Sequence, residues 1–172
     1  FEKDSCGVGF VVNVKGQQSH GIVQQALTVL NNLRHRGACG CEANTGDGAG
    51  ILLQIPHYYY RQAAKQAGFS IPGPKEYGVG MVFLPKDAGQ RKTQEKIFEQ
   101  IIKEEGQRFL GWRDIQTDNS SLGPTAVSGE SSVRQIFIGR NSKLQDDQAF
   151  ERKLYVIRRR AENMIRYAKV PG

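Results

Sequence analysis

Hydrophobic positions in the first third of the chain follow two different periods. Residues 7–14 (GVGFVVNV) combine β-branched and aromatic side chains, which favours a strand, with Gly16 available for the turn after it. Apolar residues then recur every three or four positions, which predicts a helix that Ser19 caps and Gly37 ends. The residues that carry this period are Ile22, Val23, Ala26, Leu27, Leu30 and Leu33.

A glycine-rich turn and a second apolar run follow this helix. In TGDGAGILLQIP, glycines crowd around Asp47 before the apolar run at residues 51–55, which Pro56 ends. This pattern predicts a tight turn that leads into a buried strand. Residues 57–67 are predicted to form a short helix that Gly68 closes.

The remaining two thirds of the chain alternate between strand and helix patterns. Strands are predicted at residues 77–84, 109–115 and 133–138, and helices at residues 90–105 and over a long final segment from Phe150 to beyond Ile165. The turn-rich segment DNSSLGPTAVSGE is either a loop or a rim that faces a substrate. Because the alternation lacks strict βαβ regularity, the fold class expected is α+β, or a layered sandwich with helices outside.

Composition narrows the classes of protein that fit. A chain of 172 residues without repeats suits one domain, and no apolar run approaches the ~18 residues of a membrane span. Three cysteines are an odd number and the leader FEKDS is no secretory signal, so a secreted disulfide framework is not expected. The net charge of +7 raises the question of nucleic acid, but the basic residues are spread out.

Cys6 is the first residue with candidate chemistry, because it stands at the leading end of the first predicted strand. One interpretation is a buried structural cysteine. The other is a nucleophile that becomes active when the Ser5–Cys6 bond is cut. The new α-amine would have a pKa of about 7.7–8.0 and would accept the thiol proton, as the base of an N-terminal nucleophile does. An amide nitrogen is not basic, so the uncut chain is expected to be silent toward amide substrates.

Other candidate residues lie after the first predicted helix and in the last one. Arg36 either caps helix carbonyls or donates in a planar fork to oxygens on a neighbouring strand. A zinc-stabilised module would use His35, Cys39 and Cys41, although a fourth ligand is missing and the spacing is not the usual C-x₂-C. The run at residues 158–160 is either the solvated face of a helix or a phosphate contact in a basic nucleic-acid-binding module.

These segments taken together resemble the N-terminal glutaminase domain of the large chain of glutamate synthases. The resemblance runs in order through CGVGF, SHGIVQQALTVLNNLRHRGA, TGDGAGILLQIPH, YGVGMVFLP and FLGWRDIQTDNSSLG to FERKLYVIRRRAENMI. It implies a class II glutamine amidotransferase of the N-terminal-nucleophile type, with an αββα sandwich that is incomplete in this chain. Residues 1–5 would be a propeptide remnant, and residues 6–172 the N-terminal part of the amidotransferase domain.

The resemblance also implies a reaction and its participants. Cys6 would be the catalytic nucleophile that hydrolyses L-glutamine through a thioester, and Arg36 would support the active site. The full enzyme, an oxidoreductase acting on CH–NH₂ donors, would use the ammonia at a 2-oxoglutarate site in a flavin domain. FMN and an iron–sulfur cluster would belong to that enzyme and no cofactor or metal to this chain. The electron donor would be NAD(P)H or ferredoxin, the location cytoplasm or plastid, and no nucleic acid or membrane is expected as a partner.

The family pattern is not complete in this sequence. By resemblance, the Asn-Gly pair of the oxyanion hole and the acidic residue that holds the substrate's α-amino group lie downstream of residue 172. Each lost oxyanion donor costs on the order of 10²–10³ in rate. The isolated 172 residues are therefore expected to have little or no glutaminase activity.

Overall fold

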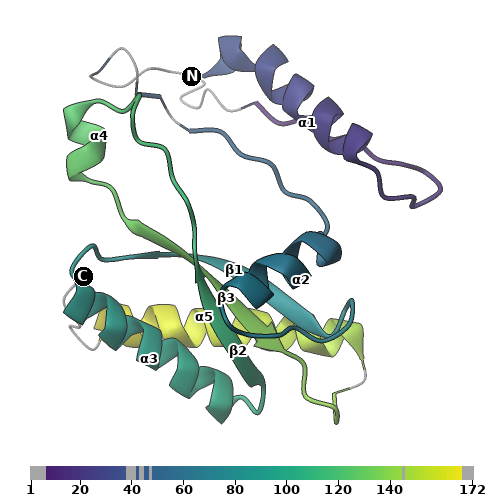
Figure 1. Cartoon of the computed structure of the whole chain (residues 1–172), viewed down its shortest axis with the longest axis vertical. Helices are drawn as coiled ribbons and strands as arrows, with labels where there is room; N and C mark the ends of the chain where they lie inside the picture. Colours follow the sequence, from purple (N-terminus) through teal and green to yellow (C-terminus); the bar gives the residue numbers. More distant parts are fainter. Residues whose placement is uncertain (1–6, 38–41, 43–44, 47, 145, 168–172) are drawn as a thin grey trace, which may run out of the picture. The chain divides into compact units, whose positions relative to one another are not determined.

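The computed structural model of the chain describes residues 7–37, 42, 45–46, 48–144 and 146–167. These residues form two compact units. The first contains the chain up to Gln54 together with residues 118–129, and the second contains residues 55–117 and 130 onward. Figure 1 shows the helices and strands of each unit. Cys6, Cys39 and Cys41 lie outside the described residues.

An antiparallel three-stranded sheet is the centre of the second unit. Its strands are β1 (Tyr77–Leu84), β2 (Arg108–Asp114) and β3 (Ser132–Gly139), in the order β1-β3-β2. The register pairs Tyr77 with Gly139 in one ladder and Trp112 with Ile136 in the other. β3 is the central strand, and its residues from Gln135 to Gly139 are all buried, as expected where both faces of a sheet are covered.

Two helices cover one face of this sheet, α3 (Ala88–Glu104) and α5 (Asp147–Tyr167) (Figure 1). Asp87 caps α3 by accepting a hydrogen bond of 2.8 Å from the backbone N–H of Gln90. Side chains that recur every three or four residues along both helices meet alternate residues of β3. The core they form comprises Phe98, Ile101, Ile102, Ile136, Ile138, Ile157 and Ala161.

The opposite face of the sheet packs against α2 (His57–Gln66) and the residues just after it. Phe137 is fully buried there, with its ring 5.3 Å from that of Tyr60 and 5.2 Å from that of Phe69. A β-bulge between Phe109 and Gly111 brings Gly111 under Phe69, where an added Cβ would lie 2.5 Å from the ring. Only glycine fits this close approach without moving the ring.

The first unit contains the helix predicted after Ser19. It is α1 (His20–Asn32), and the Ser19 hydroxyl accepts the expected capping bond from the N–H of Ile22 at 3.4 Å. A short 3₁₀ helix, η1 (Arg34–Arg36), continues from α1, so Gly37 closes η1 rather than α1 as predicted. The turn-rich segment 118–130 also contains a short helix, α4 (Pro124–Ser128), which the sequence pattern did not indicate.

Two predicted strands are wrong for this structure. Residues 7–14 and 51–55 form neither a strand nor a helix. Alternate apolar residues of the first segment are exposed, with Phe10 at 88% and Val14 at 97%. A strand requires a hydrogen-bonded neighbour, and these segments pair with no strand among the described residues. Strand-like composition alone therefore did not produce a ladder here.

The other predicted elements are confirmed with small shifts in their ends. β1 has the predicted bounds, and β2 and β3 lie within one residue of theirs at each end. α3 begins two residues earlier than predicted because Asp87 supplies its cap. The mixed helices and antiparallel sheet confirm the α+β class. Among the described residues the sandwich is incomplete, since one sheet is formed.

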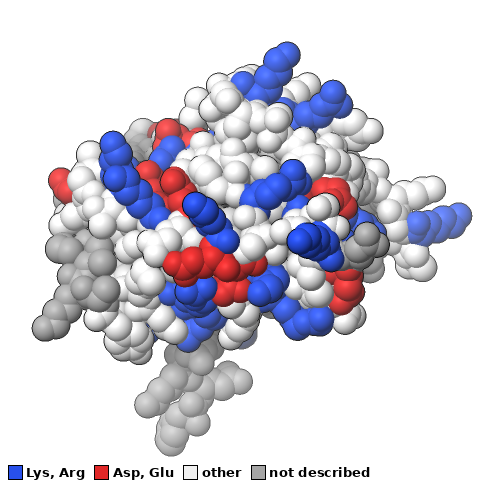
Figure 2. Space-filling model, turned by 90° about the horizontal axis from the view of Figure 1, so that it is seen from below, with Lys and Arg blue, Asp and Glu red and all other residues white. Residues whose placement is uncertain are grey.

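An ion cluster joins the two helices on the outer side of the second unit. The Glu105 carboxylate accepts from Lys153 and from Arg160, each at 2.7 Å, and Arg160 also contacts Glu104 at 2.5 Å. Figure 2 views the molecule from this side and shows acidic and basic side chains intermixed. Hydrogen bonds from Lys153 and then from Arg160 hold the pKa of Glu105 below its ordinary value.

This cluster predicts acid-sensitive stability. Glu105 keeps its charge to a lower pH in the folded than in the unfolded chain, so its contribution is complete above about pH 4.3 and is lost as the pH falls further. We expect Glu105→Gln to reduce the free energy of unfolding by about 1–2 kcal/mol at pH 7 and by much less at pH 3. Urea unfolding at both pH values measures this.

The matched control is Glu162→Gln, which removes an ion pair formed within α5 itself. Glu162 pairs with Arg159 at 2.6 Å within the helix and is 40% exposed, so its removal should cost no more than about 0.5 kcal/mol. An equal loss for both variants, or a Glu105→Gln loss as large at pH 3 as at pH 7, would contradict the assignment.

Candidate functional site

Arg36 is the predicted site residue that the structure describes. α1 and η1 carry the chain to it, and the N–H of Arg36 donates to the carbonyl of Leu33 at 2.8 Å. The C-terminal end of this 3₁₀ turn presents the arginine at the surface. The 3₁₀ turn thus fixes the backbone position of Arg36. The first carbons of its side chain, the stem, contact one specific residue.

That neighbour is the glycine that follows Cys6. A Cβ added to Gly7 would lie 3.2 Å from the Cβ of Arg36 and 3.2 Å from a methyl group of Leu33. One step along the same side of the chain, a Cβ on Gly9 would lie 2.5 Å from the Cγ1 of Val29. Residues 7–9 therefore lie flat against α1 and η1, and glycine at positions 7 and 9 permits this close approach.

This packing gives the CGVGF motif a structural meaning. Glycines two positions apart face the same side of an extended chain, and here Gly7 faces Arg36 of η1 while Gly9 faces Val29 of α1. The composition of residues 7–14 favours a strand, but the i, i+2 spacing of these two glycines is a signal for a flat contact. Gly7, the residue after the predicted nucleophile in the sequence, and the stem of Arg36 therefore belong to one local structure.

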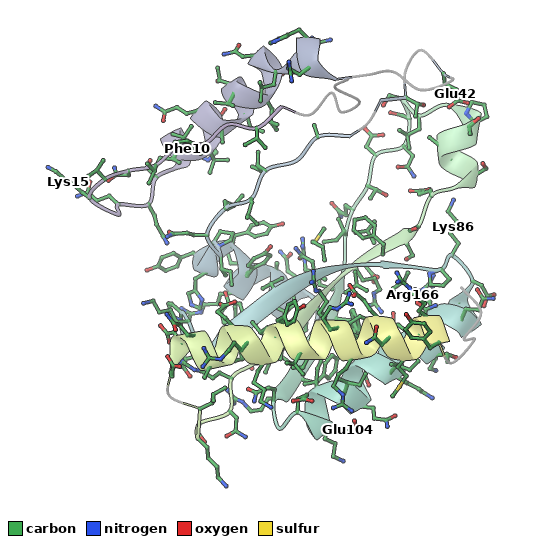
Figure 3. All side chains as sticks on the ribbon, turned by 180° about the vertical axis from the view of Figure 1, so that it is seen from behind. Phe10, Lys15, Glu42, Lys86, Glu104 and Arg166 are labelled. Carbon is green, nitrogen blue, oxygen red and sulfur yellow. The ribbon has the colours of Figure 1, made fainter. Side chains whose placement is uncertain are left out.

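The first unit also contains a polar contact that the sequence did not indicate. The Glu42 carboxylate accepts from the backbone N–H of Thr125 at 2.9 Å and from the hydroxyl of Thr45 at 3.0 Å. Figure 3 shows Glu42 beside α4. The partners Glu42 and Thr125 are 83 residues apart, so no local pattern indicates the contact.

The residues proposed for zinc do not form a site within the described part of the chain. His35 Nδ1 lies 2.9 Å from the carbonyl oxygen of Asn32, and Cys39 and Cys41 lie outside the described residues. No group of three or more His, Cys, Asp or Glu side chains that could hold a metal occurs among the residues described.

The basic run on α5 is engaged in ion pairs. Arg159 contacts Glu162 at 2.6 Å, and Arg160 contacts Glu104 and Glu105. Pairing of this kind supports the interpretation of residues 158–160 as a solvated helix face and does not favour a phosphate-binding module. Within the described helices, none combines the length and hydropathy needed to cross a bilayer.

Comparison with known proteins assigns this chain to a family. The family described as glutamine amidotransferases class-II matches residues 6–170. The chain is 46% identical over 163 residues to the glutamate synthase [NADPH] large chain of Bacillus subtilis, covering 95% of this chain and 11% of that protein. It is 38% identical to the glutamate synthase [NADH] of Schizosaccharomyces pombe over 170 residues, covering 96% of this chain and 8% of that protein.

A plant relative shows the same pattern of coverage. The chloroplastic ferredoxin-dependent glutamate synthase 2 of Arabidopsis thaliana is 35% identical over 166 residues, which is 95% of this chain and 10% of the relative. The chain thus spans about a tenth of the length of the curated relatives it matches. Since the family match covers nearly every residue from Cys6 onward, the chain belongs to the class II glutamine amidotransferases.

Proposed function

We propose that this chain is the glutamine-hydrolysing part of a glutamate synthase and that Cys6 is its nucleophile. The observation that carries the proposal is that the family match begins at Cys6 and continues to residue 170. The packing of Gly7 on Arg36 supports it, because it associates the chain next to Cys6 with an arginine. Residues 1–5 are then the remnant of a propeptide, and the amidotransferase domain begins at residue 6.

The chemistry uses the free α-amine of Cys6 as a base. The amine accepts the thiol proton, and the thiolate attacks the side-chain amide carbon of L-glutamine. A carbon–sulfur bond forms, and the carbon–nitrogen bond breaks as the proton passes to the leaving group, which departs as ammonia. Water then attacks the thioester, releases glutamate and restores the thiol. No oxidant or reductant is consumed in these steps.

Arg36 is the second residue of the proposed site. A guanidinium offers five N–H donors in a planar fork and stays charged at any physiological pH, so it suits an oxygen or carboxylate of the substrate. Its stem is held by the contact with Gly7, and η1 sets the position of its backbone. Arg36 thereby orders the substrate beside the nucleophile without taking part in proton transfer.

The fate of the ammonia belongs to the whole enzyme. In a glutamate synthase, ammonia meets 2-oxoglutarate in a flavin domain, and reduction gives a second glutamate. The relatives' names include NADPH, NADH and ferredoxin as donors, so the donor for this protein is NAD(P)H or ferredoxin. FMN and an iron–sulfur cluster supply the electron transfer there. Both groups are proposed to belong to other domains of the full enzyme. Cytoplasm or plastid is the proposed location.

Covalent labelling of the full-length, processed enzyme tests this proposal. Diazo-oxo-norleucine, an electrophilic analogue of glutamine, should abolish glutamine-dependent activity and add once, at Cys6, and excess glutamine should protect against it. Cys39 and Cys41 serve as internal control thiols, and peptide mass spectrometry distinguishes the three. Adducts on Cys39 or Cys41 alone, or inactivation without any adduct at Cys6, would contradict the assignment of the nucleophile.

A further inference from the structure

Val29, in the last turn of α1, is the residue on which the N-terminal segment rests. A Cβ added to Gly9 would lie only 2.5 Å from the Cγ1 of Val29, which is closer than two such carbons can pack. Because valine is β-branched, its rotamer in a helix is nearly fixed, and this methyl group cannot easily turn aside. Gly9 does not have a positive φ, so the requirement at this position is space rather than conformational freedom.

The exposure of the neighbouring side chains agrees with this contact. Val8 and Val12 are 87% and 69% exposed, whereas Val11 is half-buried. Side chains alternate between the two sides of an extended chain. The side of the chain that carries Gly7 and Gly9 is therefore the side that meets α1 and η1, and the apolar side chains of even number point away from it.

Backbone hydrogen bonds connect Val29 to Arg36 within α1 and η1. The N–H of Leu33 donates to the carbonyl of Val29 at 3.1 Å, and the N–H of Arg36 donates to the carbonyl of Leu33 at 2.8 Å. The same three residues meet the N-terminal segment, since Val29 faces Gly9 while Leu33 and Arg36 face Gly7. One continuous surface thus holds both glycines and includes the stem of Arg36.

We propose that Val29 is a positioning residue for glutamine binding. By seating Gly9, it keeps Gly7 packed against the stem of Arg36, which restricts the conformations open to that side chain. The guanidinium is then held in the arrangement that orders the substrate. This inference rests on the proposed function of Arg36 and Cys6.

The mechanism predicts an effect on KM rather than on kcat. If the segment lifts from the helix and the binding arrangement of Arg36 is occupied about a tenth of the time, apparent affinity falls about tenfold. Arg36 orders the substrate and takes no part in proton transfer, so kcat at saturation should stay within about twofold of the wild type. A loss confined to kcat would contradict the assignment.

Reciprocal changes of side-chain size in the full-length enzyme test the inference. Gly9→Ala should raise the KM for glutamine about tenfold, because the new methyl group overlaps Val29. Val29→Ala removes the overlapping methyl group, so the double variant should return to within about twofold of Val29→Ala alone. Val29→Ala by itself leaves a gap but no overlap, and it should change the KM less than Gly9→Ala does. Ammonia-dependent synthesis should keep its rate in these three variants.

Arg36→Ala shows whether the effect passes through Arg36. If it does, adding Gly9→Ala to Arg36→Ala raises the KM no further, because both changes remove the same arrangement. Additive effects would overturn the inference. Gly7→Ala is a second check, because its Cβ would crowd Arg36 and Leu33 rather than Val29. It should raise the KM for glutamine, and Val29→Ala should not rescue it.

The matched control is Gly21→Ala near the start of α1, where an added Cβ would make an ordinary 3.7 Å contact with the hydroxyl oxygen of Ser19. It should leave the KM for glutamine unchanged. An unchanged KM in Gly9→Ala, no rescue by Val29→Ala, or loss of ammonia-dependent synthesis through misfolding would each overturn the inference. Failure of the proposed function is distinct, because the wild-type enzyme would then show no labelling at Cys6 or Arg36→Ala would leave the KM unchanged.

Discussion

Replacement of Cys6 with alanine is expected to abolish glutamine-dependent glutamate synthesis in the full-length enzyme while ammonia-dependent synthesis continues. The sulfur of the Cys6 thiol is the atom that forms the proposed covalent intermediate, and alanine offers no nucleophile in its place. Removing the nucleophile of a hydrolase can lower kcat by on the order of 10⁶-fold. Steady-state assays with either glutamine or ammonium as the nitrogen source measure the two activities separately.

Controls for this variant come from the other thiols of the chain. Cys39→Ala and Cys41→Ala should retain glutamine-dependent synthesis, because neither residue has a place in the proposed thioester chemistry. Cys6→Ser should also be inactive with glutamine, since a hydroxyl is far less acidic than a thiol. Glutamine-dependent turnover by Cys6→Ala above the ammonia background would refute Cys6 as the nucleophile. Loss of both activities would indicate a role beyond glutamine hydrolysis.

Retention of residues 1–5 is expected to suppress glutaminase activity by at least about 10²-fold relative to the form that begins at Cys6. General-base catalysis contributes about 10²–10⁴-fold, and the amide at an uncut Ser5–Cys6 bond cannot act as that base. In the processed form, activity should fall as the pH drops below about 7.7–8.0, where the amine becomes protonated. Intact mass and N-terminal sequencing confirm which form is assayed.

A form that begins at Ser5 is the matched control for this experiment. It lacks four of the five leader residues but still blocks the amine of Cys6. We expect it to be as inactive as the complete leader, which separates the loss of the base from the bulk of the leader. A fully active enzyme whose N-terminus is Phe1 would contradict the proposed role of the α-amine.

Local patterns were sufficient for most of the second unit. Apolar residues recur every three or four positions in residues 90–105 and in the final segment, and this period predicted helices correctly. Residues with that spacing are neighbours on one face of a helix, so the signal is local. In the first unit, Ser19 is predictable as a cap because its partner, the N–H of Ile22, lies three residues away. Such interactions are encoded over short distances in sequence, so the pattern and the structure agree.

The same reasoning failed where the outcome depended on distant partners. Residues 7–14 have the composition of a strand, but a ladder needs a second chain segment at hydrogen-bonding distance. The helix at 124–128 is too short for a visible period and is capped from 83 residues away by Glu42. Composition predicted neither the missing ladder at residues 7–14 nor the helix at 124–128, because both outcomes depend on residues that are distant in sequence.

The sequence by itself determined the family, the α+β class, the helices and strands of the second unit, and Cys6 and Arg36 as candidate residues. Only the tertiary structure decided that Gly7 and Gly9 lie against η1 and α1, and that Glu42 binds the first free N–H of α4. The physical reason is the range of the interactions. Side-chain period and capping act between near neighbours, whereas close backbone approach and long-range capping exist only after the chain has folded.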